Sequence, residues 1–343
     1  WLVLKGMAMG AADVVPGVSG GTIAFISGIY EELISSINGI RPSLLGVLKR
    51  QGFRAFWKQL NGGFLLSVLS GIAISVLSLA KGISWLLTYQ PILLWSFFFG
   101  LVLASVFYVA KGINRWNLSV IVMGIVGAAL AYLVVSLPVS QAQATLPYLF
   151  LSGALAICAM ILPGISGAFI LVLLGSYKTV LDAVHQRDLQ VILIVGAGAV
   201  VGLLSFARLL KWMFSKFKNA TLALLTGFII GSLPKIWPWK VVLESEIFDG
   251  KEIPLRETVV APWIYPEDPQ WFPALGLAIL GLGTFGYVSS EDQSVRQALS
   301  MTASAVTTVG LREGCARGPA GRAGRSLRAV GGLGVGGGGG AEV

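Results

Sequence analysis

The feature that most constrains this chain is a membrane-length apolar segment that is broken in its middle and then repeated. Residues 5–30 read KGMAMGAADVVPGVSGGTIAFISGIY, with a break at Pro16-Gly17. Residues 152–177 read SGALAICAMILPGISGAFILVLLGSY and align with the first copy without a gap, so that Pro163 falls on Pro16. A hydrophobic segment that is interrupted at corresponding positions in the two halves of a membrane protein points to the binding site of a transporter.

The composition is that of an integral membrane protein. Hydrophobic residues make up 55% of the 343 residues and charged residues only 12%, about half of the roughly 25% that is usual in soluble domains. Several apolar runs of about 17 to 20 residues are long enough to cross a hydrocarbon core of roughly 30 Å. The sequence therefore predicts an all-α polytopic membrane protein with about six full transmembrane helices. These helices are expected at residues 64–80, 91–110, 118–137, 190–207, 220–236 and 272–288.

The charged residues predict the orientation of these helices. The connection 35–63 holds five basic residues and no acidic one, and 208–218 is also basic without an acid. The positive-inside rule places both segments in the cytoplasm, whereas 237–271, with seven acidic residues, reads as an extracytoplasmic loop. Phe53 and Trp57 lie among the basic residues, which suits either an amphipathic helix at the membrane surface or an ordinary loop. Membrane orientation accounts for the net charge of +9, and no nucleic acid is expected as a partner.

The repeat divides the chain into two units and a tail. An odd number of crossings separates the two broken segments, so one copy is inverted relative to the other, as in many secondary transporters. Charge alone leaves open whether each broken segment is a re-entrant helical hairpin or crosses the membrane fully. The predicted units are 1–137, with the broken segment 1–34, then 138–288, with the broken segment 148–177, and a disordered or non-native tail, rich in Gly, Ala and Arg, at 289–343.

The two breaks present backbone groups that suit a bound anion. Pro16 and Pro163 each interrupt a helix, and the neighbouring glycines let a ligand approach the backbone closely. A helix that restarts after such a break has unpaired N–H groups at its start, which favour an anion such as phosphate. Ser19 and Thr22 would add hydroxyl donors. The predicted phosphate-binding residues are Gly17, Ser19, Gly20, Gly21, Thr22, Gly164, Ser166, Gly167 and Arg208.

Two simpler explanations stay open. The breaks can be kinks at which helices pack closely through glycines. Arg208 lies at the end of a predicted helix, and its long side chain can extend to the membrane surface rather than to a substrate.

Asp13 is the most informative single side chain. A carboxylate within a membrane segment is costly and is a functional hypothesis by default, so Asp13 is a candidate site for a coupling ion, either H⁺ or Na⁺. Alternatively, it caps the restarted helix or pairs with a basic residue such as Arg208. The second copy has Met160 at the equivalent position, which makes the two breaks chemically unequal.

Residue types that carry catalytic chemistry are scarce. His185 is the one histidine, and the two cysteines, Cys158 and Cys315, have neither metal-binding nor redox spacing. The sequence therefore predicts no enzyme activity, no metal and no organic cofactor.

The motifs GAADVVPGVSGGT and ILPGISGAFILVLLGSY resemble those of the bacterial polyprenyl-phosphate transporter family, well over residues 1–240 and loosely to 288. The resemblance implies a multi-pass protein of the bacterial cytoplasmic membrane that returns undecaprenyl phosphate to the cytoplasmic face for synthesis of peptidoglycan and other envelope polymers. Polyprenyl phosphate and membrane lipids are then the expected partners, and a homo-oligomer is left open. The family's motif residues correspond to Asp13, Pro16, Gly17, Ser19, Gly20, Gly21, Thr22, Pro163, Gly164, Ser166 and Gly167.

Three other functions fit some of these features. A secondary transporter of small anions or other solutes would use the same broken helices. An intramembrane enzyme such as a lipid phosphatase would need a nucleophile or metal cluster that the sequence does not offer. A scaffold without transport activity would leave the charged, helix-breaking segments unexplained.

Overall fold

The computed structural model describes residues 1–288 except 16–17, 141–144 and 249–250. Pro16, Gly17 and the predicted tail 289–343 therefore lie outside the described residues. The first half of the chain forms α1 (Leu2–Val14), α2 (Gly20–Ile26), α3 (Tyr30–Gly39), α4 (Ser43–Gln59), α5 (Gly62–Tyr89), α6 (Pro91–Lys111) and α7 (Leu118–Ser136). The second half forms α8 (Leu146–Ile161), α9 (Gly167–Leu173), α10 (Tyr177–Gln186), α11 (Leu189–Lys216), α12 (Lys218–Ser232), η1 (Leu233–Ile236), β1 (Lys240–Phe248), β2 (Lys251–Val259), η2 (Pro262–Ile264) and α13 (Trp271–Val288).

Among the described residues, five helical segments are long and apolar enough to cross a membrane, judged by length and composition. They are α5, α6, α7, α11 and the continuous stretch of α12 with η1, which correspond to five of the six predicted spans. The bent pair α9–α10, which turns by 109°, would add one more span if it counts as one. The sixth predicted span, 272–288, is helical within α13. The protein is thus a mostly helical, multi-pass membrane protein, as predicted.

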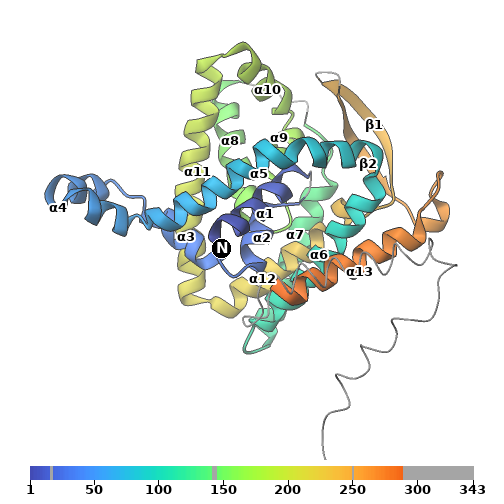
Figure 1. Ribbon diagram of the computed structural model, residues 1–343, viewed down its shortest axis with the longest axis horizontal. Coiled ribbons are helices and arrows are strands. Elements are labelled where there is room, and N and C mark those ends of the chain that lie inside the picture. The colour runs from blue at the N-terminus through green and yellow to red at the C-terminus, as the bar shows by residue number, and fades with distance from the viewer. Residues whose placement is uncertain (16–17, 141–144, 249–250, 289–343) are drawn as a thin grey trace, which may run out of the picture.

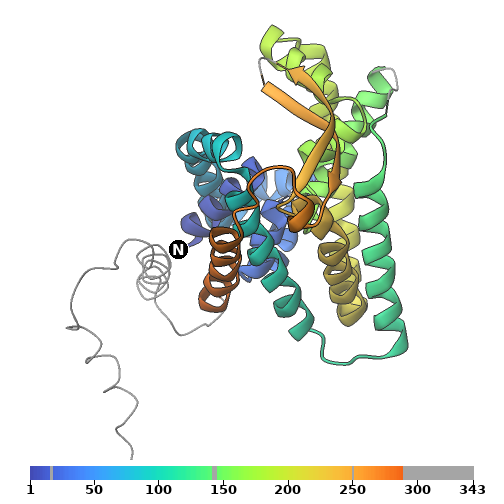
Figure 2. The ribbon, with the colours of Figure 1, turned by 90° about the vertical axis from the view of Figure 1, so that its right-hand side faces the viewer.

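The prediction of an all-α fold is wrong in the loop 237–271. There β1 and β2 pair as an antiparallel hairpin, with Lys240 opposite Val259 and Val242 opposite Glu257. The strand sequences KVVLESEIF and KEIPLRETV are rich in β-branched and other apolar residues, and such residues favour the pleated conformation. Four of the seven acidic residues that pointed to a water-exposed loop therefore lie in the strands of a hairpin, namely Glu244, Glu246, Glu252 and Glu257. The hairpin stands at one end of the molecule (Figures 1 and 2).

Corresponding helices of the two halves pair in corresponding ways. α1 packs along α5, and α8 packs along α11. Both pairs approach closely at glycine, because a methyl group on Gly6 would collide with the carbonyl oxygen of Val68, and one on Gly153 with that of Val195. α6 packs on α13, and α7 packs on α12, so each half contributes two helices that lie against the other half. Small residues at such contacts let the helix backbones approach.

Three segments with basic residues gather at the end of the molecule opposite the β-hairpin. They are the connection 35–63, the end of α6 and the loop after it, with Lys111 and Arg115, and 208–218. The Asn114 N–H, in the loop after α6, donates to Asn219 Oδ1 at 3.3 Å, which places this loop beside the start of α12 (Figure 2). Lys211 Nζ on α11 donates to Ser35 Oγ on α3 at 3.2 Å, so the connection 35–63 starts there too. This grouping agrees with the expectation that 35–63 and 208–218 share one side of the membrane. That this side is the cytoplasm stays a prediction.

The connection 35–63 contains a helix, α4, which extends away from the rest of the molecule (Figure 1). It bends at Gly52, whose φ of 80° lies in the left-handed region that suits glycine. The Phe53 side chain is 64% exposed and stacks on Trp57 with ring centroids 5.7 Å apart. The amphipathic helix that was one of two open predictions is therefore formed, and its contact with lipid stays a prediction.

Two predicted helix ends are wrong. The span expected at 64–80 continues to Tyr89, and the one expected at 190–207 continues to Lys216. No proline interrupts either extension, and apolar residues persist between the charged ones. Arg208 therefore lies within α11 rather than in the turn that follows it.

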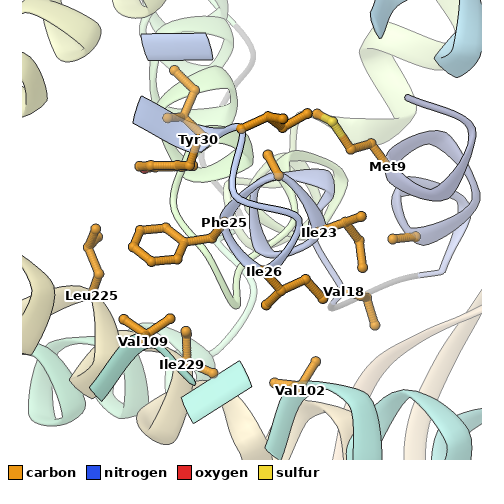
Figure 3. Close-up of a cluster of buried hydrophobic side chains, with 14 of the residues drawn as sticks. Met9, Val18, Ile23, Phe25, Ile26, Tyr30, Val102, Val109, Leu225 and Ile229 are labelled. Atoms are coloured by element: carbon orange, nitrogen blue, oxygen red, sulfur yellow. The ribbon is translucent and has the colours of Figure 1, made fainter. Parts of the chain in front are cut away.

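The short helix α2 lies in the centre of the packed helices. All seven of its residues are buried. Its side chains Phe25 and Ile26 face Val102 and Val109 of α6 and Ile229 of α12 within one apolar cluster (Figure 3). This burial holds the first helix break at the middle of the molecule.

Candidate functional site

The first break is formed by local signals in the sequence. α1 ends at Val14, and Val15, which precedes Pro16, is extended with φ −88° and ψ 117°. A residue before proline is driven out of the helical region by the proline ring. Ser19 is the N-cap of α2, and its Oγ accepts a hydrogen bond from the Gly21 N–H at 3.0 Å. The chain thus leaves one helix and starts another within a few residues.

The second break repeats this geometry. α8 ends at Ile161, and Leu162, before Pro163, is extended with φ −66° and ψ 134°. Gly164 has a φ of +95°, which only glycine adopts without strain. Ser166 caps α9, and its Oγ accepts from the Phe169 N–H at 3.2 Å. Pro163 thus lies between two separate helices, α8 and α9.

The two breaks touch each other. Ser19 Oγ donates to the carbonyl oxygen of Met160 at 2.8 Å, and the Gly164 N–H donates to Thr22 Oγ1 at 2.9 Å. Gly21 lies so close to the end of α8 that a methyl group there would collide with the carbonyl oxygen of Ile161. Residues separated by about 140 positions in the chain thus form one buried contact, which we call the break contact.

Asp13 caps the restarted helix. Its Oδ1 accepts a hydrogen bond from the Gly20 N–H at 2.7 Å, so a carboxylate lies where an anion is favoured by the amides of a helix start. Its Oδ2 is buried, and no residue of the described chain forms a hydrogen bond with it. Of the three roles left open for Asp13, capping is the one that the geometry shows. Asp13 and Arg208 are both described, and they form no ion pair.

The expectation that the amides of the first break lie bare is wrong for this conformation. The Gly20 N–H is bound to Asp13, the Gly21 N–H to Ser19 Oγ, and the Thr22 N–H to the carbonyl oxygen of Ser19 at 2.9 Å. A buried polar group that has no hydrogen-bond partner raises the free energy of the folded state. The protein itself therefore fills the positions that a phosphate would need.

The second break lacks an equivalent of the Asp13 carboxylate. Gly167, which aligns with Gly20, has the uncharged Met160 at the position of Asp13. Gly167 and the neighbouring Phe169 are also half-buried, whereas Gly20 is fully buried. The two breaks are therefore chemically unequal, as the sequence indicates.

The remaining predicted site residues lie apart from this contact. Arg208 is exposed on α11, and within the described residues no hydrogen bond or ion pair links it to either break. Its role in binding phosphate stays a prediction. Pro16 and Gly17 lie outside the described residues.

In each broken segment, the residues after the second helix contact the early part of the first helix. Lys5 Nζ on α1 donates to the carbonyl oxygen of Ser27, after α2, at 2.5 Å. In the second segment, Tyr148 OH on α8 donates to the carbonyl oxygen of Leu174, after α9, at 2.8 Å. Both returns contain a glycine with positive φ, 73° at Gly28 and 65° at Gly175. The sequence alignment paired these two glycines, but the turn that each one makes was not predicted.

A group of charged residues that sequence reasoning missed lies close to the second break. Lys235 Nζ is 2.8 Å and Lys240 Nζ is 3.6 Å from Glu257 Oε2. Lys235 Nζ also lies 4.8 Å from the centroid of the Phe169 ring on α9. The available signal was the run Lys-Ile-Trp-Pro-Trp-Lys at 235–240, in which two cations flank tryptophans at the start of an otherwise acidic loop.

Comparison with known proteins agrees with this geometry. The model of a family described as undecaprenyl phosphate translocase-like matches residues 9–252, most of the chain and both breaks. The chain belongs to this family. A protein from Vibrio cholerae, named polyprenyl-phosphate transporter, is 48% identical over 281 residues, which cover 80% of this chain and 91% of that protein. A protein of the same name from Staphylococcus aureus is 33% identical over 258 residues, 69% of this chain and 86% of that protein.

No solved structure matches this member of the translocase-like family. The matched region includes the break contact, Lys235 and Lys240, whereas Glu257 lies just beyond it. The resemblance that the two motifs indicated is therefore confirmed at the level of the family.

Proposed function

We propose that this protein moves polyprenyl phosphate, with undecaprenyl phosphate as the expected carrier, across the bacterial cytoplasmic membrane for reuse in envelope synthesis. The observation that carries the proposal is the break contact, in which two helix breaks meet in the centre of the protein around a buried carboxylate. In a lipid phosphate, only the charged head resists crossing hydrocarbon, and the prenyl tail can stay in lipid. A polar site at the middle of the membrane lowers that barrier.

Further support comes from the way the two broken segments enter the molecule. The first returns to α3, whose Asn38 Nδ2 donates to the carbonyl oxygen of Ala207 on α11 at 2.6 Å, at the basic end. The second returns beside the loop that follows α7, where the Ser140 N–H donates to the carbonyl oxygen of Leu173 at 2.7 Å, at the hairpin end. Two re-entrant hairpins from opposite faces, related as inverted repeats, account for both facts.

The groups that close the break contact are also suitable donors for a phosphate. Separating the two breaks frees the Ser19 hydroxyl, the Thr22 hydroxyl and the Gly164 N–H, each of which can donate to an anionic oxygen. The two hydrogen bonds that must break contribute about 1 to 3 kcal/mol together, an amount that the charge-assisted bonds to a phosphate can replace. In this proposal the structure represents the closed state, and headgroup binding exchanges one set of bonds for another.

Asp13 is the proposed site of ion coupling. A phosphate that replaces its carboxylate at the Gly20 amide would stand beside a like charge, which is unfavourable at low dielectric. Binding of H⁺ or Na⁺ to Asp13 removes that repulsion, so the ion and the lipid would bind together. An Asp13→Asn variant keeps an oxygen acceptor for the Gly20 N–H but no longer titrates. We expect its transport to continue without dependence on an ion gradient.

The test is transport in proteoliposomes that carry polyprenyl phosphate in both leaflets. A soluble phosphatase added outside hydrolyses only the outer leaflet in protein-free vesicles, and about half of the lipid is protected. Wild-type protein should expose the protected fraction. The double variant Ser19→Ala, Ser166→Ala should slow this exposure at least about tenfold, because it removes one hydroxyl that could donate to the phosphate at each break.

A matched control is Ser67→Ala, because the Ser67 hydroxyl donates only to the carbonyl oxygen of Gly63 on an exposed helix face. Equal exposure rates in the double variant and this control would remove the break contact from the mechanism. The alternative of a small-anion transporter is tested in the same vesicles with labelled inorganic phosphate. Uptake of inorganic phosphate without movement of the lipid would overturn the proposed substrate.

A further inference from the structure

Lys235, Lys240 and Glu257 form a mostly buried group with an excess of one positive charge. Their side chains are 18%, 7% and 14% exposed. Glu257 Oε2 accepts from Lys235 Nζ at 2.8 Å and lies 3.6 Å from Lys240 Nζ. One carboxylate oxygen therefore serves both ammonium groups. Burying a cation without a full counter-charge is unfavourable, so this arrangement calls for a second anion.

Among the described residues, the remaining contacts of the two lysines do not supply that anion. Lys240 Nζ lies 3.9 Å from the centroid of the Trp95 ring and donates to the carbonyl oxygen of Lys235 at 3.1 Å. Both partners are electrically neutral. Burial lowers the pKa of Lys240 to about 8, and the positive charge of Lys235 adds to this effect, while Glu257 opposes it. The two lysines hold the pKa of Glu257 below its usual value although burial alone would raise it.

The lysine pair lies next to the second break. Lys235 Nζ is 4.8 Å from the ring centroid of Phe169, and Phe169 donates its N–H to the capping residue Ser166. Gly164 packs against Ser232 on the other side of the break, and Ser232 is three residues before Lys235. An anion held by the lysines would thus lie close to the second break, on the side of the β-hairpin.

An apolar cavity of about 650 Å³ adjoins the same segment. It lies between α6, the stretch 237–239 and α13, and it includes Ser96, the neighbour of Trp95. Its volume is in the range of small-molecule sites, which are mostly apolar with a few polar groups. The aromatic and aliphatic part of its lining is formed by Phe99, Trp237, Trp239, Trp271, Phe272 and Leu275.

We infer that Lys235 and Lys240 form a capture site for the phosphate head of a prenyl lipid at the hairpin end of the protein, with the first isoprene units of its chain in the tryptophan-lined cavity. The inference rests on the proposed function and extends it, because it names where the lipid binds before it reaches the break contact. The lysine pair and the cavity together favour a prenyl phosphate. The cationic pair fits a phosphate monoester, and the adjoining apolar cavity fits the chain that free phosphate lacks.

Glu257 would compete with the phosphate for the two lysines. It occupies the lysine pair when no lipid is present, and it competes with the phosphate for the same ammonium groups. Removal of its charge by Glu257→Gln should therefore tighten binding of a prenyl phosphate by about fivefold, since hydrogen bonds to an ionised partner are about twice as strong as neutral ones. Removal of a lysine charge by Lys235→Met or Lys240→Met should weaken binding at least about tenfold.

The experiment measures binding of farnesyl phosphate to the full chain in lipid nanodiscs by calorimetry, with farnesol and inorganic phosphate as comparison ligands. Wild-type protein should bind farnesyl phosphate more tightly than either comparison ligand. The control is Lys216→Met, which removes the same charge from an exposed residue at the opposite end of the molecule. Because Lys240 is buried and its substitution can impair folding, Lys235→Met and Glu257→Gln provide independent measurements.

The outcomes separate this inference from the proposed function. Equal affinity for farnesyl phosphate in Lys235→Met, Glu257→Gln and Lys216→Met overturns the capture site, even where the wild type transports the lipid. Affinity that falls in Lys235→Met and rises in Glu257→Gln supports it. If these shifts occur but the phosphatase assay shows no lipid movement by the wild type, the capture site stands and the transport function fails. The double variant Ser19→Ala, Ser166→Ala should retain farnesyl phosphate binding, because the capture site lies outside the break contact.

Discussion

Gly21→Ala is the substitution that tests the break contact most directly. A methyl group at this position would collide with the carbonyl oxygen of Ile161 and would lie 2.9 Å from that of Met160. Both obstacles are backbone atoms of the other broken segment, so no side-chain rotation can relieve them. The two breaks must move apart, and the hydrogen bonds Ser19–Met160 and Thr22–Gly164 lengthen or break as they do.

The expected loss of stability has two parts. Forcing an extra methyl group into a packed interior costs about 1 to 3 kcal/mol. Loss of the two hydrogen bonds adds about 0.5 to 1.5 kcal/mol each. Relative to a glycine-to-alanine change that meets no obstacle, Gly21→Ala should therefore lower the free energy of unfolding by about 2 to 6 kcal/mol.

The matched control is Gly82→Ala in α5, where nothing lies within 4 Å of the added methyl group. Both glycines are helical, so both variants gain the same helix propensity, about 0.5 to 1 kcal/mol. The comparison therefore isolates the contact. The measurement is unfolding by SDS in mixed micelles, followed by circular dichroism. A Gly21→Ala variant that unfolds within about 0.5 kcal/mol of Gly82→Ala, an ordinary effect for a neutral site, would refute the break contact.

The remaining predictions concern the capture site and the two turns. Lys240, which faces Lys235 and Glu257, has a pKa of about 8, so above this pH the free protein must take up a proton to bind farnesyl phosphate. The affinity measured by calorimetry should fall by up to about tenfold per pH unit above pH 8. Lys240→Arg, which stays charged, should abolish this fall. A fall in affinity that persists in Lys240→Arg would contradict the assignment. Gly28→Ala should destabilise the protein by about 1 kcal/mol through its positive φ alone, because nothing lies near it, whereas Gly175→Ala should cost more, because its methyl group also meets the carbonyl oxygen of Ser140. Equal unfolding free energies for these two variants would show that the second turn does not pack as described.

The parts of the site that could be predicted from the sequence are those that depend on local chemistry. Proline disfavours the helical conformation at the residue before it, which accounts for the extended Val15 and Leu162 at the ends of α1 and α8. Serine after the break is a favourable helix cap, which places the starts of α2 and α9. Because the same local signals occur twice, the sequence also indicated that the two breaks would resemble each other.

The parts that could not be predicted depend on contacts between distant residues. The sequence leaves several partners open for Asp13, and only the fold shows that its carboxylate reaches the Gly20 amide. Glu257 counted as one of seven acids in a loop, because hairpin pairing, not its neighbours in the chain, brings it to Lys235 and Lys240. The β-branched residues of the two strands favour a pleated conformation, but strand formation depends on packing more than on intrinsic preference, so residue types alone did not separate a hairpin from a loop.

The two sites share one physical arrangement, and it bears on how a carrier can release what it binds. At the break contact the carboxylate of Asp13 accepts a hydrogen bond from the Gly20 amide, and near the hairpin the carboxylate of Glu257 partly neutralises Lys235 and Lys240. A buried donor without a partner is costly, so an empty site with bare donors would hold any anion tightly and part with it slowly. An internal carboxylate changes binding into an exchange between two anions, which lowers the net affinity of each site for the lipid phosphate. Two such exchanges in sequence would let a lipid phosphate pass from the lysine pair to the break contact without a deep free-energy minimum, and removal of either carboxylate charge should tighten binding at its own site while slowing release.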